Sequence, residues 1–202
     1  KIECEIIVVD DNSPDGTADE VRKAYENNKS VRLIVRKNER GLGSALGRGA
    51  EEAKKDIIVF MDTDFSHDPK IIPRLIKITK KYDIASGSRY LKGSELKTTK
   101  FRKLATNMVR AYMNFVLGLK ITDYSNGFIA IKKSIIKDLK DKKIFYGYGD
   151  YAFRLFYHAI KNNAKIKDIP VSYKFREEGQ SKTNFIKHGF QYAREAIKLR
   201  FG

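Results

Sequence analysis

Short apolar runs alternate with amphipathic segments along the chain. The runs at residues 4–9, 31–35 and 57–61 end in polar loops, and each loop leads toward a segment with helical periodicity. Apolar runs of this length, bounded by turn residues, are typical of buried strands. The alternation predicts an α/β fold, with a mainly parallel, Rossmann-like sheet flanked by helices.

Particular residues mark the predicted starts of two helices. Thr17 and Glu20 have the spacing of a capping box, and Asp68 with Pro69 predicts another helix start. The helix after Pro69 leads to a strand predicted near 83–86. The second half predicts, in chain order, a long amphipathic helix over 101–117, a strand over 128–131, a helix over 151–160 and short strands within 166–175. Residues 176–184 are polar and aperiodic, so we expect a loop that can order over a ligand.

Composition sets limits on domain number and compartment. A chain of 202 residues with 42% hydrophobic content is expected to form a single domain. Its one cysteine, Cys4, excludes an internal disulfide and a Cys-based metal site, and fits the reducing, cytosolic side of a membrane. No apolar stretch approaches the roughly 20 residues that cross a bilayer, so we expect a soluble or peripheral protein. Since the chain starts just before a strand, we also expect that an N-terminal strand is missing.

The formal net charge of +16 points to anionic partners. Phosphorylated substrates, nucleic acid and an acidic membrane surface all meet that description. A Lys-rich surface of the kind found in heat-adapted proteins gives the same excess with no partner. The net charge therefore favours an anionic partner, but it does not distinguish a phosphorylated substrate from nucleic acid or a membrane surface.

Two pairs of carboxylates follow predicted strands. Asp10 and Asp11 come after the run 6–9, and Asp62 and Asp64 after the run 57–61. The carboxyl ends of parallel strands meet at one edge of a sheet, where ligands bind in open α/β folds. Acids crowded there repel one another unless a cation offsets them, and oxygen ligands suit Mg²⁺ or Mn²⁺. The pattern predicts a metal–nucleotide site; alternatively, Asp62 and Asp64 only cap a turn.

Six short motifs occur in a fixed order. They are IIVVDDNSPDGT at 6–17; Gly41, Leu42, Gly43 and Ala45; Asp62, Thr63 and Asp64 with His67 and Pro69; Gly87, Ser88, Arg89 and Tyr90; Asp123, Asn126, Gly127 and Phe128; and Arg176, Gly179, Ser181 and Lys182. Together they resemble the family 2 glycosyltransferases, inverting enzymes of GT-A fold, and the last set resembles the polyprenol-phosphate enzymes of the dolichol-phosphate mannose synthase type. The resemblance covers nearly the whole chain.

The resemblance implies a donor, an acceptor and a metal. The donor is a nucleotide-sugar of the GDP-mannose or UDP-glucose type, the acceptor a polyprenyl or dolichyl phosphate, and the cofactor Mg²⁺ or Mn²⁺. The implied nucleotide-binding residues are Asp10, Asp11, Ser13, Gly41 and Asp62, and the implied metal ligands are Asp62 and Asp64. The implied acceptor-binding residues are Arg102, Thr106, Arg176, Ser181 and Lys182. Catalysis would rest on Asp64, Arg89, Arg102, Arg176 and Lys182.

The acceptor decides whether a base is needed. A phosphate monoester has its second pKa near 6, so at neutral pH it already offers an unprotonated oxygen. A sugar hydroxyl would instead require a carboxylate base, for which Asp150 is the nearest candidate, although its place also predicts a helix cap. The sequence departs from the family pattern at two places. The strand, turn and helix that family members carry ahead of this point do not precede residue 1 here, and Ser66 stands where the family has Gln.

Two other functions compete with a transferase. Gly41, Gly43 and Gly47 before Asp62 loosely match an NAD(P)-binding oxidoreductase, but the spacing is GxGxxxG and the first glycine lies far from its strand. The charge, with 12 Phe and 11 Tyr, also fits a nucleic-acid-binding module. Because aromatics such as Phe60, Phe115 and Phe156 occupy core-like positions, we expect no nucleic-acid partner.

The last predicted helix has a basic and apolar pattern. Its apolar stripe comprises Ile186, Phe190, Ala193, Ile197 and Phe201, and its border comprises Lys187, Arg194, Lys198 and Arg200. A membrane-surface helix and a helix packed on the sheet share this form. We expect the first half to pack and the end to approach an anionic bilayer. His67 is expected to hydrogen-bond a carboxylate of the metal motif.

Overall fold

The computed structural model describes residues 2–94, 100–172 and 185–202, and for 100–102 and 185–190 it describes the backbone alone. The elements in chain order are β1 (Ile6–Asp10), α1 (Thr17–Tyr25), β2 (Val31–Val35), α2 (Leu42–Glu52), β3 (Ile57–Phe60), the 3₁₀ turn η1 (Pro69–Ile71), α3 (Ile72–Thr79), β4 (Ile84–Ser88), α4 (Lys100–Leu117), β5 (Ile129–Lys132), α5 (Lys133–Asp138), α6 (Tyr151–Lys161), β6 (Ile166–Pro170) and α7 (Phe185–Phe201).

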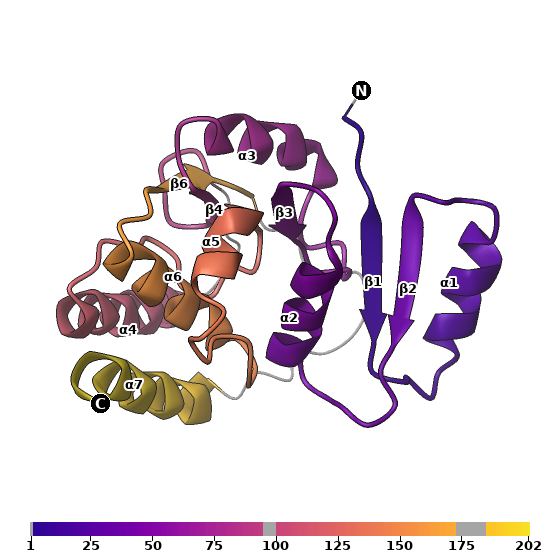
Figure 1. The fold of residues 1–202 in the computed structure, drawn as a ribbon. Coiled ribbons are helices and arrows are strands. Elements are labelled where there is room, and N and C mark those ends of the chain that lie inside the picture. The colour runs from indigo at the N-terminus through magenta and orange to yellow at the C-terminus, as the bar shows by residue number, and fades with distance from the viewer. Residues whose placement is uncertain (1, 95–99, 173–184) are drawn as a thin grey trace.

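The strands form two sheets. β1 and β2 pair in parallel, and the larger sheet has the order β3-β5-β4-β6. Strand β5 runs antiparallel to both β3 and β4, whereas β4 and β6 are parallel. The α/β class is confirmed, and β5 makes the larger sheet mixed. Figure 1 shows α1 at one end of the molecule and α4 with α7 at the other.

The central strands are apolar because both faces of the sheet are covered. Ile84 and Ile131 pack among α4 and α6 residues on one face, and Ala85 and Ala130 pack with Leu75 of α3 on the other. All five side chains are fully buried. A strand that is covered on both sides carries small or apolar residues at successive positions, as Ile84 with Ala85 and Ala130 with Ile131 do here.

Predicted boundaries agree with the structure except at a few positions. The capping box at Thr17 is wrong, because α1 begins after Gly16, whose φ is +82°, and the Thr17 hydroxyl donates to Asp15. The cap at Asp68 is confirmed, since its carboxylate accepts from the N–H of Lys70. Helix α5 was not predicted, and the expected loop at 176–184 lies outside the described residues.

The expectation that the aromatic residues are buried is wrong for Phe115. Its side chain is 87% exposed, whereas Phe60 and Phe156 lie in the core. Helical periodicity identifies which residues share a face, but it does not say which apolar face is covered. Within the described parts of the chain, no helix is long and apolar enough to span a membrane.

A buried arginine organises the loop before α6. Arg154 donates to the carbonyl of Ile144 at 2.9 Å, to Asp150 at 2.6 Å and to Glu195 of α7 at 3.0 Å, and its guanidinium stacks over the ring of Tyr146. Asp150 stands at the start of α6, but its carboxylate does not cap the helix. It accepts from Arg154 and from the N–H of Tyr148, so the predicted cap is corrected to an ion pair.

The loop at 144–150 presses on α2 at two glycines. A Cβ at Gly43 would lie 2.6 Å from the carbonyl oxygen of Tyr146, and one at Gly47 would lie 2.7 Å from Cβ of Phe145. The N–H of Gly43 also donates to the carbonyl of Gly147. The glycines therefore allow close packing of helix against loop.

We expect Gly43→Ala to lower the free energy of unfolding by roughly 1–3 kcal/mol, because the new methyl overlaps backbone that cannot move aside easily. Gly49→Ala in the same helix is the matched control. A Cβ there would meet only Val9 at 3.4 Å, so the higher helix propensity of Ala should raise stability by up to about 1 kcal/mol. Urea denaturation followed by circular dichroism measures both, and equal effects would contradict this account.

Candidate active site

The first carboxylate pair lies at the carboxyl end of β1. Asp10 is buried and accepts from the N–H of Ser13 at 3.0 Å and from its hydroxyl at 2.6 Å. Asp11 accepts from the N–H of Gly41 at 2.7 Å. The expected nucleotide-binding residues Asp10, Asp11, Ser13 and Gly41 are thus brought together, and their hydrogen bonds to one another fix the loop that follows β1.

Arg36 is the counterion of Asp11. Its side chain is buried at the end of β2, and Nε donates to Asp11 at 2.7 Å. The guanidinium also donates to Ser44 and to the carbonyl of Gly41, so one side chain ties both strand ends to the start of α2. Gly41 has φ +121°, a conformation that favours glycine.

The second carboxylate pair follows β3. Asp64 accepts from the N–H and the hydroxyl of Ser66. His67 is buried, and its Nδ1 accepts from the backbone N–H of Asp62 at 3.1 Å. Its Nε2 therefore carries the proton and donates to the side-chain oxygen of Asn126 at 2.9 Å. Burial lowers the pKa of His67 below its usual value, in keeping with this neutral ring.

These two contacts differ from the carboxylate hydrogen bond that we expected for His67. The ring holds the backbone of the metal motif against the loop before β5, and it stacks on Phe128. Directly after Asp64, Phe65 has φ +60°, which is unusual for a bulky residue, and its side chain is 69% exposed. The structure thus places an exposed phenyl ring next to Asp64.

Asp62 meets residues from two other loops. A Cβ at Gly127 would lie 3.5 Å from Asp62 Oδ1 and 3.2 Å from the Tyr151 hydroxyl. Burial, with Asp62 nearby, raises the pKa of Tyr151, which keeps that hydroxyl protonated. Tyr151 begins α6 directly after the loop that packs on α2, so one stretch of chain meets the start of α2 at Gly43 and approaches Asp62 at Tyr151.

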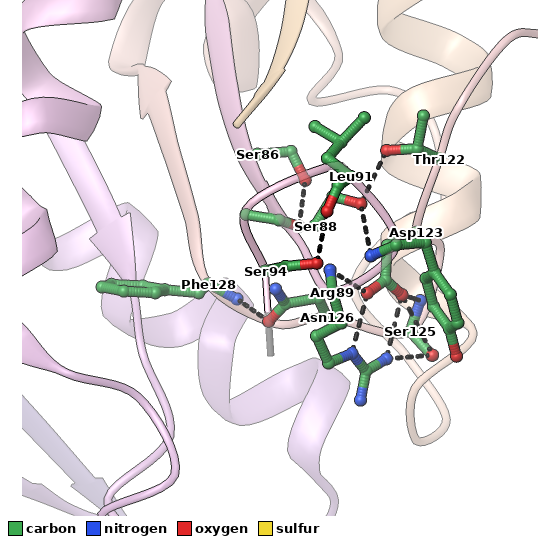
Figure 2. Close-up of polar contacts among 12 residues, drawn as sticks. Ser86, Ser88, Arg89, Leu91, Ser94, Thr122, Asp123, Ser125, Asn126 and Phe128 are labelled. Carbon is green, nitrogen blue, oxygen red and sulfur yellow. Dashed lines mark hydrogen bonds and ion pairs between the residues drawn. The ribbon is translucent and has the colours of Figure 1, made fainter. Parts of the chain in front are cut away.

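Arg89 is held at the end of β4 by Asp123. Its Nε and one Nη donate to the two carboxylate oxygens at 2.7 and 2.9 Å, and the same Nη donates to Ser125. Figure 2 shows this fork together with Asn126, whose oxygen accepts from the N–H of Phe128. Asp123 is fully buried. The pair fixes the loop that supports His67.

The expected acceptor-binding residues are only partly described. Thr106 lies on α4, where its side chain is hydrogen-bonded to Tyr90, the neighbour of Arg89. Arg102 also lies on α4, but its side chain is outside the described residues, as are Arg176, Ser181 and Lys182. Their roles stay predictions.

The expected metal site offers few protein ligands. In residues 2–94, 100–172 and 185–202, no group of three or more His, Cys, Asp or Glu side chains is arranged to hold a metal ion. Asp62 and Asp64 alone supply two carboxylates from one loop. Mg²⁺ is typically bound by one or two carboxylates together with substrate phosphates and waters. The donor set therefore fits an ion that binds with a diphosphate.

The contacts of α2 weaken the dinucleotide-binding interpretation. In that motif the N–H groups at the start of the helix bind a pyrophosphate, and the glycines allow its approach. Here the N–H of Gly43 donates to the carbonyl of Gly147, and Gly43 and Gly47 accommodate Tyr146 and Phe145. Packing of α2 against the loop explains these glycines.

The partners of the site acids could not be found from the sequence. Arg36 lies 25 residues from Asp11, and Asp123 lies 34 residues from Arg89. Asp123 and Asn126 stand in a motif that identified the family resemblance, which was the one signal available for them. No signal distinguished Arg36 or Arg154 from the other basic residues.

The chain is similar in sequence to curated proteins that are named as mannosyltransferases. The chain is 33% identical over 204 residues to a dolichol-phosphate mannosyltransferase of Pyrococcus furiosus, with 96% of the chain matched but only 54% of that relative. It is 29% identical to an undecaprenyl-phosphate mannosyltransferase of Micrococcus luteus, matching 99% of the chain and 88% of the relative. The chain thus spans about half the length of the first relative and most of the second.

Solved structures agree with the GT-A fold. Glucosyl-3-phosphoglycerate synthase from Mycobacterium tuberculosis, in complex with phosphoglyceric acid, superposes with a TM-score of 0.71 at 17% identity, over 97% of this chain and 69% of that one. The same enzyme with Mn²⁺, UDP and glucosyl-3-phosphoglycerate gives 0.67 at 18% identity, over 96% and 67%. The model of "Glycosyl transferase family 2" matches residues 1–140. This chain therefore belongs to glycosyl transferase family 2.

Proposed function

We propose that this protein transfers a hexose, with inversion, from a nucleotide-sugar of the GDP-mannose or UDP-glucose type to a polyprenyl or dolichyl phosphate at the cytosolic face of a membrane. The observation that carries the proposal is that residues 144–151 meet the start of α2, next to the Gly41 that Asp11 holds, and approach Asp62 through Tyr151. It supports one donor site that spans the carboxyl ends of β1 and β3, although the two strands belong to different sheets. The names of the polyprenyl-phosphate relatives support the acceptor.

Asp62 and Asp64 would hold Mg²⁺ or Mn²⁺ on the donor diphosphate. The bound ion would supply charge stabilisation for the leaving diphosphate. Mn²⁺ or Mg²⁺ with UDP in the mycobacterial synthase supports a divalent ion in this fold. Asp10 and Ser13 would border the nucleoside, and Asp11 would act by holding Gly41 in place.

The state of Asp150 supports a phosphate acceptor. This carboxylate is buried and accepts from Arg154 and from the N–H of Tyr148, so it is badly placed to take a proton from a sugar hydroxyl. A phosphate acceptor needs no such base. Its unprotonated oxygen forms the bond to the anomeric carbon, while the bond from that carbon to the diphosphate oxygen breaks and the diphosphate leaves with the electron pair.

Basic side chains would align the two phosphates. Arginine binds phosphate through paired N–H donors, and lysine adds a mobile charge. We assign the acceptor phosphate to Arg102, Thr106, Arg176, Ser181 and Lys182, and the donor side to Arg89. The support for this division is the placement of Thr106 beside Tyr90, on the helix that also carries Arg102.

Donor binding should depend on the metal. At a concentration 100 times Kd, a nucleotide-sugar stabilises the fold by about 2.7 kcal/mol, which corresponds to a rise in Tm of roughly 5–10 °C. We expect this rise for GDP-mannose or UDP-glucose with Mn²⁺, and its loss in Asp64→Asn. Asp68→Asn is the matched control, because the Asn side chain can still accept the hydrogen bond from the N–H of Lys70. This variant should retain the rise in Tm. An equal shift without metal would contradict the site.

The acceptor class can be tested by transfer of a radiolabelled sugar. We expect product with polyprenyl phosphate and none with the corresponding polyprenol, because the alcohol lacks an ionised oxygen. Since the acceptor's second pKa is near 6, the rate at subsaturating acceptor should fall about tenfold between pH 7 and pH 5. Transfer to the alcohol at a similar rate would favour an enzyme that acts on hydroxyl groups.

Asp123→Asn should disturb the donor side through Arg89. Removing one partner of a buried ion pair is expected to lower the free energy of unfolding by about 3–5 kcal/mol. Ser125→Ala removes a neutral partner of the same guanidinium and should lower it by only about 1 kcal/mol. Urea denaturation of both variants compares them, and a similar loss in each would show that the charge of Asp123 is unimportant.

A further inference from the structure

Helix α4 has two apolar faces, and in the described part of the chain one is buried and the other is exposed. Met113 and Leu117 are buried in the core. The opposite face carries four large apolar side chains that are exposed by 60, 65, 37 and 87%: Leu104, Met108, Tyr112 and Phe115. At 100° per residue, these four lie within an arc of about 80°. Solvent-facing sides of helices are normally polar, so this stripe calls for a partner.

The exposed face of α7 continues the pattern. Arg194, Ile197, Lys198 and Phe201 recur at helical spacing and are all exposed, Phe201 by 78%. Helices α4 and α7 pack against each other, and Figure 1 shows them side by side at the end of the molecule opposite α1. We call the four α4 residues together with Ile197 and Phe201 the apolar face.

The charges around the apolar face are basic. Lys103 is exposed in the first turn of α4, Lys120 is exposed three residues after the helix ends, and Arg194, Lys198 and Arg200 are exposed on α7. In the parts of both helices whose side chains are described, the one acid is Glu195, which pairs with Arg154. A second copy of the chain would bring like charges together across a two-fold axis. Anionic lipid headgroups above acyl chains match both the charge and the apolar stripe.

We propose that the apolar face of α4 and α7 docks on an anionic bilayer. This inference rests on the proposed function, because a lipid-linked acceptor requires the protein to reach a membrane. It goes beyond the expectation for the last helix, since α4 supplies most of the apolar surface. Through Thr106 and Tyr90, the same helix contacts the end of β4, so docking brings the bilayer next to the acceptor side of the site.

The absence of tryptophan makes the test direct. The chain contains no Trp, so Phe115→Trp introduces a single fluorophore on the apolar face. With vesicles of phosphatidylcholine and phosphatidylglycerol, we expect its emission to shift to shorter wavelength and to be quenched by brominated acyl chains. Tyr25→Trp on α1, where Tyr25 is 48% exposed, is the matched control and should show neither change. Equal changes in both variants, or none in Phe115→Trp, would overturn the proposal.

Co-sedimentation with the same vesicles measures affinity. We expect Met108→Gln with Phe115→Gln to weaken partitioning by at least about tenfold, and Tyr25→Gln to leave it unchanged. Arg194→Gln with Lys198→Gln should weaken it by a similar factor, and added salt should then matter less. Binding that is indifferent to all these changes would contradict the assigned face.

Two further outcomes separate this proposal from others. A vesicle-independent blue shift of Phe115→Trp that grows with protein concentration would assign the face to a second copy and overturn bilayer docking. Sugar transfer to a short, water-soluble isoprenyl phosphate tests the proposed function without a membrane. If the protein binds vesicles but does not transfer sugar to this substrate, the proposed transferase function is refuted and docking is not. If the protein transfers sugar, with or without Met108→Gln and Phe115→Gln, but does not bind vesicles, docking is refuted and the transferase function is not.

Discussion

Carboxylate–arginine pairs hold the loops of the candidate active site. Asp11 pairs with Arg36, and the pair fixes the start of α2. Asp123 pairs with Arg89 and fixes the loop before β5, while Asp150 pairs with Arg154 before α6. Each pair is at least partly buried, so loss of one partner leaves a charge in an environment that solvates it poorly. The site depends on these pairs because its segments come from strands that do not all belong to one sheet.

These pairs assign different tasks to acids that look alike in the sequence. Asp11, Asp123 and Asp150 are bound to arginine, whereas Asp10 accepts from Ser13 and Asp62 lies beside Gly127 and Tyr151. The acids with an arginine partner shape the loops. This division agrees with the proposed chemistry, in which a hard cation requires carboxylates at the end of β3.

Much of the fold and part of the site could be predicted from residue patterns. The strand at Val31–Val35 and the acids after β1 and β3 followed from apolar runs that end in polar residues. Arg36 and Arg154 could not be identified, because tertiary structure selects one arginine among many. The burial of Phe115 was predicted wrongly because α4 is apolar on two sides, and helical periodicity does not tell which side faces the core. The cap at Thr17 failed because Gly16 enters the helix through a left-handed turn.

Glu195 gives the C-terminal helix a role in the interior. Its carboxylate binds Arg154 and the Tyr146 hydroxyl, so α7 is anchored to the same guanidinium that supports residues 144–150. Those residues in turn pack on the first turns of α2. A force that pulls α7 outward would therefore strain the loop beside the donor side. Helix α7 and the loop at 144–150 therefore form one mechanical unit, in which tension on the helix reaches the loop.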